Sequence, residues 1–139
     1  MNPLLQKNAA MKIDELMIND WIMLKSNEKI GQVESINAYP THHSVFISGD
    51  ENVYLEEDFK GIPLTEDILK KNFSYDKNDE LYYYNGLNFI FSEEDNAVLV
   101  GQNGIGFYGD EFHYFTFIKT VHELQHVLKI CKIYIEIEL

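Results

Sequence analysis

The sequence contains no arginine: all 11 of its basic residues are lysines, against 23 acidic residues, and the net charge is −12. Arginine supplies the forked donors that recognise phosphates and guanine edges. An acidic chain repels a nucleic-acid backbone unless its cations gather on one face, and these lysines are scattered along the sequence. We therefore expect no nucleic-acid partner and interpret the acidity as a source of solubility.

Cysteine and long apolar runs are also scarce. Cys131 is the only cysteine, so no intrachain disulfide can form, which is typical of a reducing compartment. No apolar run approaches the roughly 20 residues that cross a bilayer. Residues 1–10 lack the basic start and apolar stretch of a secretory signal. We expect a cytoplasmic protein with no membrane partner.

What the chain does contain is typical of a folded protein rich in sheet. Hydrophobic residues make up 45% of its 139 residues and aromatic residues 14%. That length suffices for one ordinary domain or for two small ones that share an interface. We expect an N-terminal extension over residues 1–10, a small β unit over 11–62, and a second part over 63–139. One compact domain over 11–139 remains an alternative.

Short apolar segments separated by polar turns occupy residues 11–62. We expect strands over residues 21–24, 30–36, 45–47 and 53–55. Several short strands in so little chain predict a small barrel or a strongly curled sheet. Gly31 is expected to mark a bulge or a close approach. The segments Asp20-Trp21-Ile22 and Gly31-Gln32-Val33 resemble small SH3-like barrels of the KOW type, many of which bind RNA or protein.

The second part begins with a clear helix start and continues as a meander. Thr65 is a helix N-cap, Leu64 and Leu69 occupy the positions of a hydrophobic staple, and Asn72 can close the helix in the left-handed conformation. We expect strands over residues 81–84, 87–91, 97–102, 105–108, 112–118 and 133–138. Asn-Gly pairs at 85–86 and 103–104 predict two tight hairpins. The strand over 112–118 is expected to be central, because few polar residues interrupt it.

The sequence therefore predicts an α+β fold that is predominantly antiparallel β. It combines a small SH3-like, barrel-type N-terminal unit with a C-terminal β-meander and one packed helix.

Residues His122-Glu123-Leu124-Gln125-His126 match the pattern H-E-x-x-H. Two histidines one helical turn apart can share a zinc ion, and the glutamate between them can act as base toward metal-bound water. On this interpretation His122 and His126 are metal ligands, Glu123 is the general base, and the protein is a minimal zinc-dependent hydrolase.

The surroundings of this motif favour a structural role. Lys129 and Lys132 stand where the extended metzincin pattern has glycine and histidine. A third ligand, His113 or Asp110, would have to come from upstream. On a helical wheel His122 and His126 lie opposite the apolar stripe, beside lysines. A capping box places its glutamate at the position that Glu123 holds after Thr120. We therefore expect no metal, no cofactor and no catalytic residue.

Other candidate sites are weaker. His42 and His43 are adjacent loop histidines, which are more typical of exposed residues than of ligands. The glycines at 101, 104, 106 and 109 lie between strands and open no helix, unlike a phosphate loop. The carboxylate runs at 56–58 and 93–95 lack the alternating spacing of a calcium loop and are typical of solvated turns.

Several segments also resemble one family, in order along residues 11–139. They are residues 11–16, 19–22, 62–69, 121–125 and the C-terminal strand, and Ile-Pro-Leu-Thr-Glu at 62–66 is the most distinctive. They resemble small proteins of Bacteroides-type bacteria and their phages, a family without an assigned activity. In that family the position of His126 is commonly asparagine, which implies that this histidine is incidental. The resemblance implies no substrate, cofactor or partner.

Three functional hypotheses follow. The first is a non-enzymatic accessory or protein-binding module, because no catalytic set converges and the sheet is rich in aromatic residues. The second is the zinc hydrolase that uses the motif at 122–126. The third is a phage-type acidic protein that mimics the charge of nucleic acid.

Overall fold

A computed structural model describes the backbone of residues 16–106 and 109–139 and the side chains of residues 16–102 and 115–139. The predicted extension over residues 1–10 lies outside the described residues. The fold is α+β and mostly antiparallel β, as predicted, with two five-stranded sheets and two α-helices in the described chain. Two compact units can be distinguished, Met1–Ile62 and Pro63–Leu139. No helix of the described residues is long and apolar enough to span a membrane.

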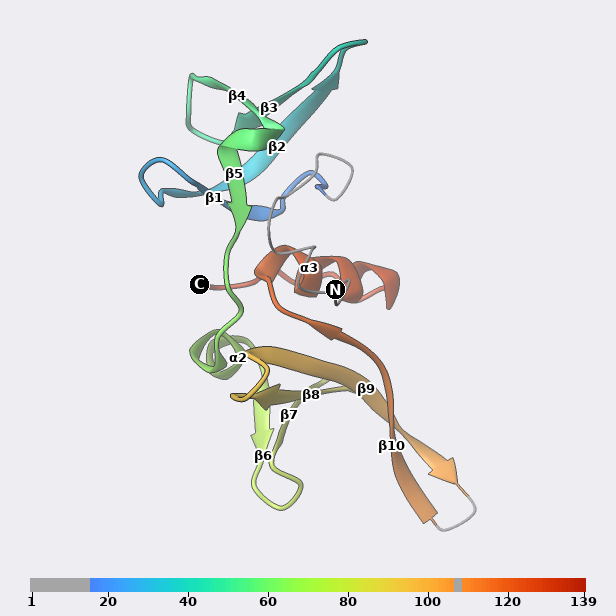
Figure 1. Ribbon diagram of the computed structural model, residues 1–139. Coiled ribbons are helices and arrows are strands. Elements are labelled where there is room, and N and C mark those ends of the chain that lie inside the picture. The colour runs from blue at the N-terminus through green and yellow to red at the C-terminus, as the bar shows by residue number, and fades with distance from the viewer. Residues whose placement is uncertain (1–15, 107–108) are drawn as a thin grey trace. The chain divides into compact units, whose positions relative to one another are not determined.

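The N-terminal unit is a single antiparallel sheet in the order β4-β3-β2-β1-β5 (Figure 1). Its elements are β1 (Trp21–Leu24), β2 (Ile30–Ala38), β3 (His43–Ile47), β4 (Val53–Leu55), the 3-10 helix η2 (Glu56–Asp58) and β5 (Phe59–Gly61). The four predicted strands are confirmed, and β5 is an additional one. The sheet is not closed, since β4 and β5 are its two edges. The predicted barrel is therefore not confirmed, although β2 is shared between two halves of the sheet.

That sharing follows from the pairing of β2. Its first half pairs with β1 through Trp21↔Gln32, and its second half pairs with β3 through Val33↔Ile47. A register shift between Val33 and Ser35 interrupts the pairing with β3 just after this change of partner. Such an irregularity bends a strand and increases its twist. The sheet can therefore curl around one core.

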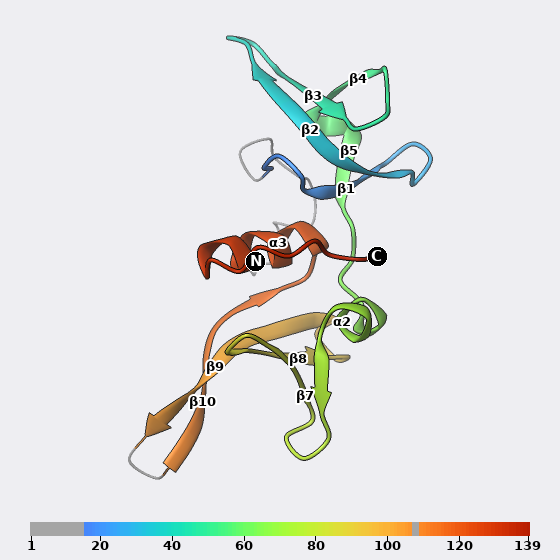
Figure 2. The ribbon, with the colours of Figure 1, turned by 180° about the vertical axis from the view of Figure 1, so that it is seen from behind.

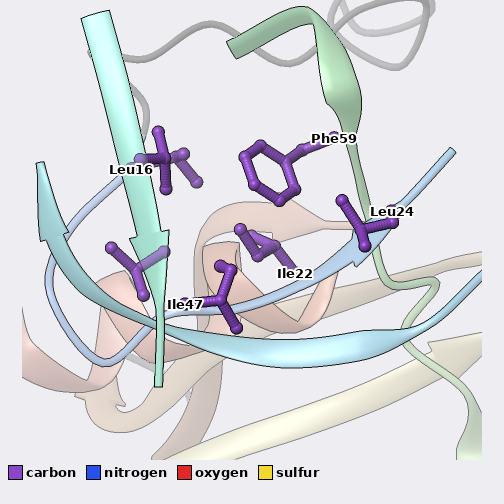
Figure 3. Close-up of a cluster of buried hydrophobic side chains, with 7 residues drawn as sticks. Leu16, Ile22, Leu24, Ile47 and Phe59 are labelled. Carbon is purple, nitrogen blue, oxygen red and sulfur yellow. The ribbon is translucent and has the colours of Figure 1, made fainter. Parts of the chain in front are cut away.

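The core of the N-terminal unit lies on the inner side of this curl. Figure 3 shows apolar side chains from β1, β3 and β5 that point toward one another, together with Leu16 from the segment before β1. The buried cluster comprises Leu16, Ile22, Leu24, Val33, Val45, Ile47 and Phe59. Burying each large apolar side chain contributes about 1.5–3 kcal/mol. The alternation of β1, with Ile22 and Leu24 inward, follows from the period of a strand.

Gly31 confirms the expected close approach. A Cβ atom at this position would collide with the side chain of Ile47. Ile22, which pairs with Gly31 on one side, pairs with Gly61 on the other. Glycine at position 31 thus lets β2 pass closely over the buried Ile47.

The C-terminal unit is an antiparallel meander in the order β10-β9-β8-β7-β6, with two helices. Its elements are α2 (Glu66–Asn72), β6 (Ser74–Asp76), β7 (Leu81–Tyr84), β8 (Leu87–Ser92), β9 (Ala97–Gly106), β10 (Gly109–Ile118) and α3 (Val121–Ile130). In Figures 1 and 2 both helices lie on the same side of this sheet. The meander was predicted, whereas only one helix was expected to pack on it.

Two local predictions for this unit are confirmed. The Thr65 hydroxyl accepts a hydrogen bond from the Ile68 amide at 3.4 Å, as an N-cap does. Asn85 and Gly86 have φ of 47° and 88°, and they form the turn between β7 and β8. Positive φ at both central positions is the requirement of a type I′ hairpin turn.

The second predicted hairpin turn is wrong. Asn103 and Gly104 lie inside β9, where Asn103 pairs with Phe112. Pairing between the two strands continues as far as Gly106↔Gly109, so the chain does not reverse at 103–104. The Asn-Gly preference is local, whereas pairing along two ten-residue strands sets the register. The prediction that 112–118 is central is also wrong, since β10 is an edge strand.

The predicted closing strand does not form either. Ile133 and Ile137 are buried and the residues between them alternate as expected, but 133–139 belongs to no strand. The segment is held instead by Asn72, whose side-chain amide donates to the Glu138 carbonyl and accepts from the Glu138 amide, both at 2.8 Å. Asn72 does not adopt the left-handed conformation expected of it. The Asn72 side chain thus makes hydrogen bonds to the backbone of this segment where a neighbouring strand was expected to make them.

We predict that Gly31→Ala destabilises the N-terminal unit by about 1–3 kcal/mol, because the added methyl group must displace Ile47. Urea denaturation followed by the fluorescence of Trp21, the single tryptophan, reports on this unit directly. Combining Gly31→Ala with Ile47→Ala should be non-additive by at least about 0.5 kcal/mol, because the second change removes the collision. Strictly additive effects would contradict this account of Gly31.

Candidate functional site

The H-E-x-x-H motif forms the first two turns of α3. The chain enters this helix at Thr120, which pairs with Pro63 in an isolated bridge, and the Leu64 amide donates to the Lys119 carbonyl at 2.9 Å. The rings of His122 and His126 lie edge to face, with centroids 5.7 Å apart. The helix therefore brings the two imidazoles together, as their spacing predicts.

Glu123 takes the predicted capping-box position, although its carboxylate accepts from the amide of Lys119, the residue before the N-cap, where a capping box uses the N-cap amide. Its amide donates to the Thr120 hydroxyl oxygen at 3.4 Å, and the same hydroxyl donates to Glu123 Oε1 at 2.9 Å. The Lys119 amide donates to this oxygen at 3.3 Å. A carboxylate at this place also interacts favourably with the positive end of the helix dipole. The side chain that a hydrolase would use as its base is thus engaged with the start of its own helix.

His122 is more buried than the helical wheel predicts. Its side chain is only 4% exposed, like its apolar neighbours Val121 and Leu124, whereas His126 is half-buried. The helical wheel assumes that only one side of the helix, the apolar stripe, is covered. In the structure the segment after α3 also runs back along the helix (Figures 1 and 2). A helix covered on two sides buries more than one stripe. The expectation that both histidines lie away from the core is wrong for His122.

A metal ion needs more ligands than this pair provides. Structural zinc sites have four protein ligands, and catalytic sites have three. Within residues 16–102 and 115–139, no three His, Cys, Asp or Glu side chains converge in a way that could hold a metal ion. The side chains of Asp110 and His113, which were considered as upstream ligands, lie outside the described residues.

The remaining sequence candidates occupy turns or strands. His42 is exposed and stacks on Tyr39, with ring centroids 4.9 Å apart. In the carboxylate runs, Asp58 accepts from the Leu55 amide at 2.7 Å, and Asp95 accepts from the Ser92 hydroxyl at 3.2 Å. These carboxylates stabilise local turns. The glycines at 101, 104 and 106 lie within β9, and Gly109 begins β10.

The C-terminal sheet has one face that its helices cover, which we call the inner face. Phe89 is fully buried there and stacks on Phe73 at the end of α2, with ring centroids 4.4 Å apart. Tyr82 donates its hydroxyl proton to Glu66 on α2 at 3.0 Å. Burial and this hydrogen bond raise the pKa of Tyr82 to about 12. Val98 and Val100 on β9 are also fully buried.

The opposite face, which we call the outer face, is apolar as well. Cross-strand pairing places side chains from four strands on it: Leu81, Tyr83, Asn88, Ile90, Leu99 and Phe117. Tyr83 is 45% exposed and Phe117 is 36% exposed, while Ile90 and Leu99 are partly exposed. A half-buried antiparallel sheet normally presents polar side chains to water. Here Tyr83, Ile90, Leu99 and Phe117 reach solvent at least in part, whereas Leu81 and Asn88 are buried.

A shallow hollow of about 330 Å³ lies at one end of the outer face. Its lining residues are Asp76, Asp79, Leu81, Tyr83, Gly86 and Asn88. Asp76 Oδ1 accepts from the amides of Asn78 at 2.8 Å and Asp79 at 3.2 Å, which fixes the turn between β6 and β7. The hollow is therefore lined by two carboxylates, an asparagine and the side chains of Leu81 and Tyr83.

Sequence reasoning missed this surface, although a signal was present. In 87–91, Leu-Asn-Phe-Ile-Phe, and in 97–100, Ala-Val-Leu-Val, apolar residues occupy both phases of the strand period. Such strands are expected to be covered on both sides. The register assigns residues to the two sides, and the fold shows that α2 and α3 cover the same one.

Comparisons with protein-family models, with curated proteins and with solved structures gave no match for this chain.

We predict that Thr120→Ala destabilises the C-terminal unit by about 1 kcal/mol, because it removes the acceptor for the Glu123 amide. Glu123→Gln should change stability by less than about 0.5 kcal/mol, since its amide oxygen can accept the same hydrogen bonds. Thermal denaturation followed by circular dichroism measures both. A neutral Thr120→Ala would contradict the capping role. Stoichiometric zinc in untagged protein, lost on His126→Asn, would contradict a purely structural motif.

Proposed function

We propose that this protein is a non-enzymatic protein-binding module, and that the outer face of its C-terminal sheet is the binding surface. One observation carries the proposal. Aromatic and aliphatic side chains line a sheet face that neither α2 nor α3 covers, with Tyr83 and Phe117 the most exposed of them.

The physical argument is the cost of leaving such a face in water. Removing apolar surface from water is favourable by about 25 cal/mol per Å², before the cost of association is subtracted. Contiguous apolar surface on a folded protein is typical of an interaction site, and aromatic residues are enriched at the centres of interfaces. Tyr83 adds a hydroxyl group, which suits a surface that is apolar in the middle and polar at its rim.

The N-terminal unit adds a second element to this proposal, because we interpret it as an SH3-like barrel-type unit. Its five short strands, the sharing of β2 between two half-sheets and the short η2 before β5 support that interpretation. Small barrels of this type commonly serve as binding modules, but function resides in sites rather than in folds.

The zinc-hydrolase hypothesis has less support in the described geometry. The carboxylate of Glu123 accepts hydrogen bonds at the start of α3, and His122 is buried. The acidic-mimic hypothesis requires carboxylates arranged along one surface at phosphate-like spacing. The two carboxylate runs have local roles instead: the run at 56–58 forms η2, where Asp58 accepts from the Leu55 amide, and the run at 93–95 lies in the turn after β8.

Site-specific photo-crosslinking tests the proposal. A photoreactive phenylalanine analogue is placed at Tyr83, and at Tyr134 as a control that is 80% exposed and lies outside the sheet. In extract of the source cells we expect discrete protein adducts from position 83 and none of the same size from position 134. The double substitution Leu99→Ser/Phe117→Ser should abolish these adducts while circular dichroism stays unchanged.

Adducts that persist in the double variant would contradict the outer face as the binding surface. Equal adducts from the two positions, or none from position 83, would do the same.

A further inference from the structure

The charge at the rim of the outer face indicates what kind of partner it fits. Asp76 and Asp79 line the hollow together with Leu81 and Tyr83. Neither carboxylate takes part in an ion pair within the described part of the chain. Lys77, between them in sequence, is exposed and does not neutralise either one in the structure.

The shape of the hollow matches a long basic side chain. A lysine or arginine side chain carries an apolar stem and a charged head. In the hollow, the stem can lie against Leu81, the head can meet the two carboxylates, and the ring of Tyr83 offers a cation–π contact. A volume of about 330 Å³ is at the lower end of the range for ligand pockets, which suits one side chain rather than a cofactor.

Other occupants fit less well. Calcium takes six to eight oxygen ligands. In the described residues, no three His, Cys, Asp or Glu side chains are placed so that they could hold a metal ion. A second copy of this chain would bring another net charge of −12 to the same surface. Like charges across an interface cost several kcal/mol in general. Charge complementarity thus selects a basic partner.

We propose that the outer face binds a segment of a partner protein in which lysine or arginine residues accompany apolar ones, with one basic side chain in the hollow between Asp76 and Asp79. This inference rests on the proposed function and adds the chemistry of the partner. The row Ile90, Leu99 and Phe117 takes the apolar residues of the segment, and the acidity of the whole chain speeds the encounter.

The test uses a synthetic ten-residue peptide that alternates lysine and leucine, with a glutamate–leucine peptide as its counterpart. Binding to the full chain is measured by fluorescence anisotropy at about 0.15 M salt, where the Debye length is about 8 Å and remote charges are screened. We expect the lysine peptide to bind and the glutamate peptide not to bind.

Two matched double variants separate the hollow from overall acidity. Asp76→Asn/Asp79→Asn removes two negative charges at the hollow, and the asparagine at position 76 keeps an oxygen for the turn. Glu93→Gln/Glu94→Gln removes two charges from the exposed turn between β8 and β9. The first double variant should raise the dissociation constant of the lysine peptide about tenfold, and the second should raise it less than twofold.

Equal effects of the two double variants, or equal binding of the two peptides, would overturn the cationic-segment proposal. The double variant Leu99→Ser/Phe117→Ser, which changes no charge, then separates the proposed binding surface from the proposed cation site. If it alone abolishes binding, the outer face remains a binding surface without a cation site. If it also has no effect, this test gives no support to the outer face, and the proposed function fails with the cation site.

Discussion

The two helices of the C-terminal unit pack on the same face of its sheet, and this arrangement decides which strand residues are buried and which meet solvent (Figures 1 and 2). Tyr82 and Tyr83 are neighbours in β7. The Tyr82 hydroxyl donates a hydrogen bond to Glu66 of α2, whereas Tyr83 is 45% exposed. Contacts distant in sequence hold the arrangement, since the Leu64 amide donates to the Lys119 carbonyl and Asn72 holds Glu138. The outer face is a consequence of this one-sided packing.

The same packing gives part of the H-E-x-x-H motif a structural role. A helix that must begin where β10 ends needs a cap, and Thr120 with Glu123 provides it. The rings of His122 and His126 are neighbours because residues four positions apart lie on the same side of a helix. Short motifs match by chance because their fixed residues also have ordinary structural roles.

Local features could be predicted from the sequence, because they depend on residues near one another. The cap at Thr65 and the turn at Asn85 and Gly86 are of this kind. The close approach at Gly31 could also be predicted, because a glycine inside a strand signals it, but its partner Ile47 on β3 could not. The turn at 103–104 failed because the register of two long strands outweighs a local preference. The closing strand at 133–138 failed because alternation predicts burial but supplies no neighbouring strand, and the side chain of Asn72 takes that place. The outer face was missed for a related reason, since periodicity does not tell which face of a two-sided apolar strand the helices cover.

The central claim is that the outer face of the C-terminal sheet is where this protein meets a partner. Hydroxyl-radical footprinting tests it most directly, because the oxidation rate of each side chain reports its own exposure to solvent. The protein is oxidised alone and with the partner recovered by crosslinking. The account predicts that oxidation of Tyr83 and Phe117 falls several-fold in the complex while that of Tyr134, on the terminal segment, is unchanged. Protection of Tyr134 with undiminished oxidation of Tyr83 and Phe117 would contradict it.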